Sequence, residues 1–198
     1  DYHMTQATAG SRPLRKASVQ NGLDGLRFDG SDDVLVASGT SSTITNLTGG
    51  QATLLAVFST ASANPDALQT IVSNGFSSAG DIGFNLFHAD RVSASESDDI
   101  RVRVVNTGSG NNVIYDCTNT GPNLTAGQFG VVSVVTDMAN GTANDRATIR
   151  VNGGAAAGTD SGSTAPASSS PSYDLHLGQA AGNSFNLDGD ICEIIIYN

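Results

Sequence analysis

The chain has 198 residues, of which 38% are hydrophobic, 14% are charged and 6% are aromatic, with 23 Gly and no Trp. Globular proteins average about 25% charged residues, so this composition excludes a coiled coil or helical bundle, which needs Glu, Lys and Arg. Recurring Val, Ile, Leu and Phe exclude a disordered acidic tail. The apolar runs are far shorter than the roughly 20 residues of a membrane span. An all-β domain punctuated by Gly remains.

Nineteen acidic and nine basic residues give a formal net charge of −10. A field of this sign repels phosphate backbones, so the charge argues against nucleic acid as a partner. The two cysteines, Cys117 and Cys192, form no Cys-x-x-Cys pattern, and each lies in or beside a predicted strand. Two interpretations stay open: separate buried thiols, which this placement favours, or one disulfide.

Alternating residues and short apolar runs, bounded by Gly, Asn, Asp and Ser, predict the strands in chain order. Residues 26–29 alternate and end in the turn sequence Gly30–Asp33, and residues 34–36 follow, which predicts a hairpin. Residues 52–59 form a denser apolar run, which predicts a central strand buried on both faces. Further strands are predicted at 70–72, 82–87, 100–105, 113–115, 129–136, 147–151, 175–178 and 191–197.

The alternation at residues 100–105 predicts one buried face and one solvated face, which carries Arg101 and Arg103. Residues 159–172 are rich in Ser, Ala and Pro and predict a flexible loop. About a dozen strands without a long helix predict an all-β fold, a two-sheet antiparallel β-sandwich. The length favours a single domain over residues 1–198.

Three parts of the chain resemble the laminin-G-like group of concanavalin A-like jelly rolls. They are Gly25–Val36 (GLRFDGSDDVLV), Val131–Asp137 with Ala147–Gly153, and Leu175–Gly178 with Leu187–Asn198. The resemblance implies a jelly-roll sandwich. Residues 3–13 are similar to a branch found in phage structural and bacterial surface proteins, in which a strand with a Trp lies upstream. We therefore expect the chain to be clipped at its N-terminus or to be one domain of a longer product.

Enzyme activity is not expected, and no catalytic residue is assigned. Sugar hydrolysis on the resembled fold uses paired carboxylates, and laminarinase-like relatives carry them in a Glu-x-Asp-x-x-Glu strand. The nearest segment, Glu96–Arg101, has Arg101 at the position of the second Glu. The chain also lacks a Gly-x-Ser-x-Gly elbow, and its three histidines, at positions 3, 88 and 176, have no recurring partners.

Calcium is the one cofactor for which the sequence offers ligands. Two oxygen-rich turns supply the candidates Asp29, Asp32, Asp33, Asn186, Asp188 and Asp190. Such loops bind Ca²⁺ through side-chain oxygens. The same side chains also stabilise turns by hydrogen bonds to nearby backbone, so both interpretations stay open.

Sugar binding is the general activity of the resembled fold, at loop tips or on the concave sheet. The candidate side chains are aromatic, imidazole or amide groups: Phe76, His88, Asn111, Asn112 and Tyr115. The chain has only seven Phe and four Tyr, so the hydrophobic core competes for the same aromatic residues.

Two functions follow. The first is a non-catalytic structural or adhesive module on a virion surface, as a phage capsid decoration (cement) or tail-associated protein. It would pack against neighbouring virion subunits or against itself, for example as a homotrimer, with loops that contact glycans. The second is a carbohydrate-binding domain of a secreted bacterial multidomain protein. Both place the protein on a virion surface or outside the cell, without nucleic acid or membrane as a partner.

Overall fold

The structure is a computed structural model of the whole chain. It describes residues 3–61, 68–75, 81–88, 100–108, 111–118, 124–142, 145–155, 159–160, 170–182 and 185–197. For residues 106–108, 111–118 and 159–160 the description covers the backbone alone. Every statement below concerns these parts of the chain.

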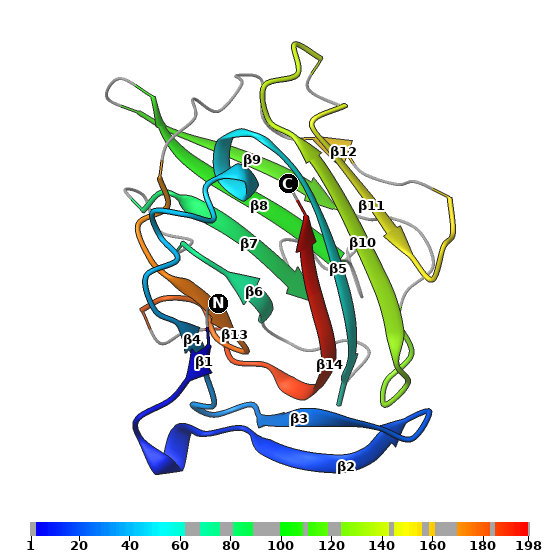
Figure 1. Cartoon of the computed structure of the whole chain (residues 1–198). Coiled ribbons are helices and arrows are strands. Elements are labelled where there is room, and N and C mark those ends of the chain that lie inside the picture. The colour runs from blue at the N-terminus through cyan, green and yellow to red at the C-terminus, as the bar shows by residue number, and fades with distance from the viewer. Residues whose placement is uncertain are drawn as a thin grey trace.

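Two antiparallel sheets form a sandwich (Figure 1). The first has six strands, in the spatial order β11 (Ala147–Val151), β10 (Gly130–Asp137), β5 (Gln51–Thr60), β14 (Asp188–Tyr197), β3 (Leu23–Asp29) and β2 (Leu14–Gln20). The second has eight, in the order β1 (Met4–Thr5), β4 (Leu35–Ala37), β13 (Leu175–Leu177), β6 (Gln69–Ser73), β7 (Gly83–His88), β8 (Ile100–Gly108), β9 (Asn111–Thr118) and β12 (Thr159–Asp160).

The helical elements of the described residues are a 3-10 turn, η1 (Ala9–Ser11), and a four-residue helix, α1 (Asn46–Gly49), and Asp145 also has 3-10 geometry. No helix in these parts is long and apolar enough to cross a membrane. The predicted all-β, two-sheet antiparallel sandwich is therefore confirmed.

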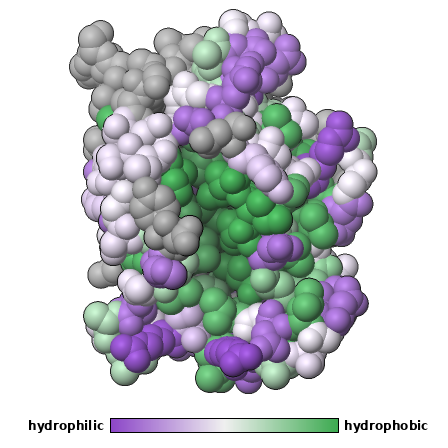
Figure 2. Space-filling view, viewed as in Figure 1, coloured by the Kyte–Doolittle hydropathy of each residue, from purple (hydrophilic) through white to green (hydrophobic). Residues whose placement is uncertain are grey.

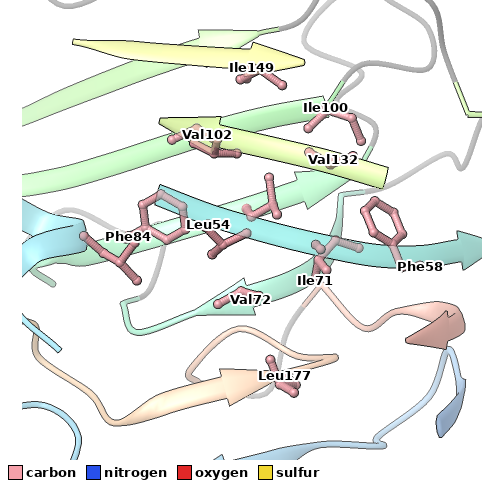
Figure 3. Packing of buried hydrophobic residues seen from close by; sticks show 14 of the residues in the cluster. Leu54, Phe58, Ile71, Val72, Phe84, Ile100, Val102, Val132, Ile149 and Leu177 are labelled. Atoms are coloured by element: carbon pink, nitrogen blue, oxygen red, sulfur yellow. The ribbon is translucent and has the colours of Figure 1, made fainter. Parts of the chain in front are cut away.

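The hydrophobic core lies between the two sheets (Figure 3). Leu54 and Phe58 project from β5 toward Ile71 and Phe84 of the opposite sheet, and all four side chains are fully buried. Their burial follows from strand geometry, because alternate residues of each strand face the interior. The positions between them therefore face outward, and these positions form the two outer surfaces of the sandwich.

The predicted hairpin between residues 26–29 and 34–36 is wrong. Residues 26–29 belong to β3, which pairs with β2 and β14, whereas residues 35–36 belong to β4 in the other sheet. The Gly30–Asp33 turn therefore carries the chain from one sheet to the other. Turn chemistry predicted the change of direction correctly, but it does not specify which strand each arm pairs with.

Strand β5 is central, between β10 and β14, as predicted. Its expected burial on both faces is wrong, because Thr53, Leu55 and Val57 are only half-buried on the outer face. Strand β8, in contrast, is more buried than expected. Its Arg101, expected on a solvated face, is buried, and Arg103 is half-buried.

Cys192 in β14 carries a free, half-buried thiol. Because the chain has only two cysteines, a disulfide between Cys117 and Cys192 is not formed. Burial raises the pKa of the Cys192 thiol, and the nearby charges of Asp190 and Glu193 raise it further. The group is therefore a protonated thiol at neutral pH.

Candidate functional site

A row of polar side chains crosses the outer face of the eight-stranded sheet. The register pairs Arg103 of β8 with Asn85 of β7, Asn85 with Ser73 of β6, and Ser73 with His176 of β13. Residues directly opposite each other in antiparallel strands project from the same face. We call these four residues the polar row.

The polar row points away from the core. The neighbours of its members along each strand, such as Phe84, Val104 and Leu177, belong to the hydrophobic core, and successive side chains of a strand face opposite sides. Asn85 and Ser73 are buried, while Arg103 and His176 are half-buried. A ligand on this face would therefore meet the two ends of the row first.

The centre of the polar row holds a buried pair of polar side chains, Ser73 and Asn85. The Ser73 hydroxyl lies 2.7 Å from Oδ1 of Asn85 and 2.5 Å from the Gly75 carbonyl oxygen. Nδ2 of Asn85 is buried, and none of the described residues accepts a hydrogen bond from it. The Ser73 hydroxyl has one proton for the two oxygens beside it, so Ser73 and Asn85 form one coupled hydrogen-bonding unit at the centre of the row.

His176 supplies an acceptor at one end of the row. Its Nδ1 lies 2.7 Å from the Asp174 carbonyl oxygen, and because a carbonyl only accepts, the proton belongs on Nδ1 and Nε2 is left as an acceptor. Burial lowers the pKa of His176, against the opposing influence of the Asp174 carbonyl and carboxylate. The imidazole is therefore neutral at pH 7. Together with the donors of Arg103 and Asn85, it suits a ligand whose hydroxyl groups both donate and accept.

The predicted sugar-contacting residues do not form this row. Phe76 lies outside the described residues, and for Asn111, Asn112 and Tyr115 the structure describes only the β9 backbone. His88 is fully buried at the end of β7, with its ring edge-on to Phe58 at a centroid distance of 6.5 Å. The structure therefore places His88 in the interior rather than at a loop tip.

The sequence held only part of the signal for the polar row. The alternation of β8 did predict a polar face containing Arg103, and His176 stood out as one of three histidines. Ser73 and Asn85 gave no signal because single Ser and Asn residues are common in this chain. Only the register of four strands from distant parts of the sequence brings the four side chains together.

The predicted calcium ligands of the first turn do gather. One carboxylate oxygen each from Asp29, Asp32 and Asp33 lies within 4.8 Å of the others. Local donors already occupy them: the Ser31 N–H donates to Asp29 at 2.8 Å, and the Ser11 hydroxyl donates to Asp32 at 2.7 Å. Burial, together with the neighbouring Asp29 and Asp32 charges, raises the pKa of Asp33. These contacts suit a turn that the carboxylates stabilise, and calcium binding stays a prediction.

The second predicted turn lies against the first. Asp188 pairs with Asp29 in the β14–β3 ladder, and Nδ2 of Asn186 donates to the Ser31 carbonyl oxygen. Asp190 is engaged in a two-point ion pair with Arg27, with both nitrogen–oxygen distances 2.7 Å. The six candidate ligands thus lie along one region of the β3–β14 pair, but Asp190 already has a cationic partner.

Glu96–Asp99, the part of the nearest glycosidase-like segment that precedes β8, lies outside the described residues. Arg101, which stands at the position of the second Glu, is the buried residue of β8 mentioned above.

Comparison with known proteins shows the fold. The CBM40 domain of Ruminococcus gnavus IT-sialidase, solved with α2,3-sialyllactose bound, aligns with 93% of this chain and 91% of its own, with a TM-score of 0.60 and 19% identity. The binding domain of botulinum neurotoxin serotype D aligns with 94% of this chain and 42% of its own (TM-score 0.56, 10% identity). A leech intramolecular trans-sialidase aligns with 93% of this chain and 25% of its own (TM-score 0.55, 18% identity).

These neighbours have in common with the chain a jelly-roll β-sandwich, which confirms that part of the sequence-based resemblance. No protein-family model and no curated protein sequence matches the chain. At such low identity the likeness shows the architecture, and the functional argument depends on this chain's own side chains.

Proposed function

We propose that the protein is a non-catalytic glycan-binding module that works outside the cell and uses the polar row on its eight-stranded sheet. The observation that carries the proposal is the cross-strand alignment of Arg103, Asn85, Ser73 and His176. Within the jelly-roll fold, we place the chain in the laminin-G-like branch on the sequence segments that resemble it.

The chemistry of the polar row suits a saccharide. A sugar hydroxyl donates one hydrogen bond and accepts others, and the row offers donors at Arg103 and Asn85 and an acceptor at Nε2 of His176. The side chains project from strands rather than from loops, so little conformational freedom is lost when a ligand binds. The likeness to a domain solved with a sialylated trisaccharide supports this class of ligand.

An array of neutral and sialylated oligosaccharides tests the proposal. We expect saturable binding to a defined subset of glycans by the wild-type protein. Replacing Arg103 by Ala should weaken binding to each hit at least tenfold, since a hydrogen bond from a charged group contributes about 1.5–3 kcal/mol.

Arg150→Ala is the matched control, because Arg150 is exposed on β11 of the six-stranded sheet. We expect it to bind within about threefold of wild type. An array without hits, or an equal loss in both variants, would contradict the proposal.

A second proposal, attachment to a virion surface, is favoured by a different observation. Val131 and Val135 of β10 are 45% and 50% exposed on the outer face of the six-stranded sheet. Figure 2 shows apolar side chains gathered on this side of the molecule. Exposed apolar patches of this kind commonly mark surfaces that pack against other subunits, either virion proteins or further copies of the chain.

Particle binding distinguishes this second proposal from the first. Co-purification of the protein with assembled virions, together with weaker co-purification of Val135→Lys, would support attachment to a virion. A lack of co-purification, with hits on the glycan array, would leave glycan binding alone.

A further inference from the structure

Strand β14 is paired on both sides along only part of its length. Its contacts with β5 run from Gly189 to Tyr197, but its pairing with β3 covers only Asp188–Ile191. Among the strands that the structure describes, none pairs with the second edge of Cys192–Tyr197. This segment, which we call the open edge, therefore has backbone groups with no ladder partner on one side.

An apolar cavity begins where β3 and β14 separate. Leu26 opposite Ile191 is the last pair of the two strands. Beyond it lies a cavity of about 290 Å³ whose walls are mainly apolar and include Leu26, Ile191, Ile194 and Leu177. The ion-paired Arg15 and Asp24, together with Glu193, also line it. Leu177 belongs to the other sheet, so the cavity reaches between the two layers. Figure 2 shows an apolar hollow on this side of the molecule, beside β14.

The open edge has little protection: one exposed charge, Glu193, and an irregularity of the ladder between Ile191 and Glu193. Exposed edges are commonly guarded by Lys, Pro or a short strand, whereas this one contains Ile194, Ile195 and Ile196 in succession. Ile194 and Ile196 pack partly against the core, so they face inward, and Glu193 and Tyr197 are exposed. Branched side chains of this kind favour an extended strand with a partner.

We propose that the open edge accepts one extended segment of a partner protein by β-strand addition. The main chain of that segment would pair with Cys192–Tyr197, and its alternate side chains, which are aliphatic, would enter the cavity beside Ile194. Its outward side chains are basic, because the position opposite the exposed Glu193 favours an opposite charge. The net charge of −10 also attracts a basic segment.

A second copy of the chain fits the open edge less well. Each copy carries a net charge of −10, and residues 192–197 contain Glu193 but no basic residue to face it. A two-fold antiparallel pairing of two open edges would therefore join two acidic molecules, and the cation beside the edge, Arg15, is already paired with Asp24. This difference commits the proposal to a basic partner segment.

Two synthetic eight-residue peptides of equal composition test the proposal by fluorescence anisotropy. In one, Lys and Val alternate, so that one face is basic and the other aliphatic when the peptide is extended. In the other, four Lys precede four Val. We expect the alternating peptide to bind saturably and the block peptide to bind at least tenfold more weakly.

Two neighbouring isoleucines provide matched variants. Ile194→Asp places a carboxylate in the cavity wall and should weaken binding of the alternating peptide at least tenfold. Ile195→Asp places the same group on the opposite face of the same strand and should change binding less than threefold. Thermal unfolding establishes that both variants fold.

Hydrogen exchange of the wild-type protein keeps the test independent of the variants. Saturating alternating peptide should slow exchange of backbone amides within residues 192–197. Equal binding of the two peptides, or absence of binding at millimolar concentration, would overturn the proposal. So would a peptide-free dimer in which residues 192–197 are already protected, since a second copy would then occupy the edge.

Discussion

At the scale of single residues, His88 is the most unusual group in the described core. It is fully buried, neither ring nitrogen has a hydrogen-bond partner, and burial lowers its pKa to about 4. Its ordinary pKa is about 6.5, so between pH 6.5 and pH 4 the unfolded chain binds a proton that the folded protein excludes. The free energy of unfolding therefore falls as the pH falls through this window.

Replacing His88 by Leu should remove this pH dependence. One pKa unit corresponds to about 1.4 kcal/mol, so wild type should lose about 3 kcal/mol more stability than His88→Leu between pH 7 and pH 4. Urea unfolding at the two pH values measures the difference. The contribution of His176 is present in both proteins and cancels.

His3→Gln is the control for this comparison, because His3 is exposed. It should keep the wild-type pH dependence. If His88→Leu loses as much stability as wild type on acidification, the titrating group is elsewhere.

The side-chain hydrogen bonds that stabilise the turns could be predicted from the sequence. The Asp-rich segment after Phe28 does form a turn, and Asp29 and Asp33 do bond to nearby backbone N–H groups. These interactions span four residues or fewer, so local sequence determines them. The burial of His88 was not predictable in this way, because it depends on a contact with Phe58 in the other sheet.

At the scale of elements, Gly189 determines how closely β14 approaches β5. A Cβ atom at this position would lie 2.1 Å from the Ser59 carbonyl oxygen and 3.0 Å from the Thr60 Cα. Both contacts are with backbone, so a side chain would force the two central strands apart. Gly189 is also the first of three residues, Gly189–Ile191, at which β14 pairs with both β3 and β5.

Gly189→Ala should lower the free energy of unfolding by about 2–4 kcal/mol, the range of overpacked and strained interior positions. Gly141→Ala is the control, because no atom lies within 4 Å of a Cβ built there. It should change stability by no more than about 0.5 kcal/mol. Urea midpoints measure both, and equal effects in the two variants would contradict this account of β14.

Strand positions were predictable from alternation, but strand partners were not. Alternation predicted β5, β10 and β11 where they occur, and β10 pairs with β11 as an antiparallel hairpin. The predicted pairing was wrong for β3 and β4, which are adjacent in the chain but lie in different sheets. A turn fixes only the local direction of the chain, whereas the pairing of β3 with β14 depends on residues more than 150 positions away.

At the scale of the whole molecule, the polar row is a product of topology. Its four residues come from β6, β7, β8 and β13, and β13 joins them only because it lies between β4 and β6. Composition and alternation predicted the two-sheet sandwich that makes such a row geometrically available. They could not predict the row itself, because the register of β13 against β6 has no local signal.

The resonance of the Asn85 side-chain amide tests the central claim most directly. A ¹⁵N-labelled protein is titrated with the strongest hit from the glycan array, and amide shifts are followed by NMR. We predict saturable shifts of the Asn85 Nδ2 protons and of the backbone amides of Ser73, Arg103 and His176. Saturable glycan binding that leaves these four residues unshifted, and moves resonances elsewhere, would contradict the assignment of the polar row as the binding site.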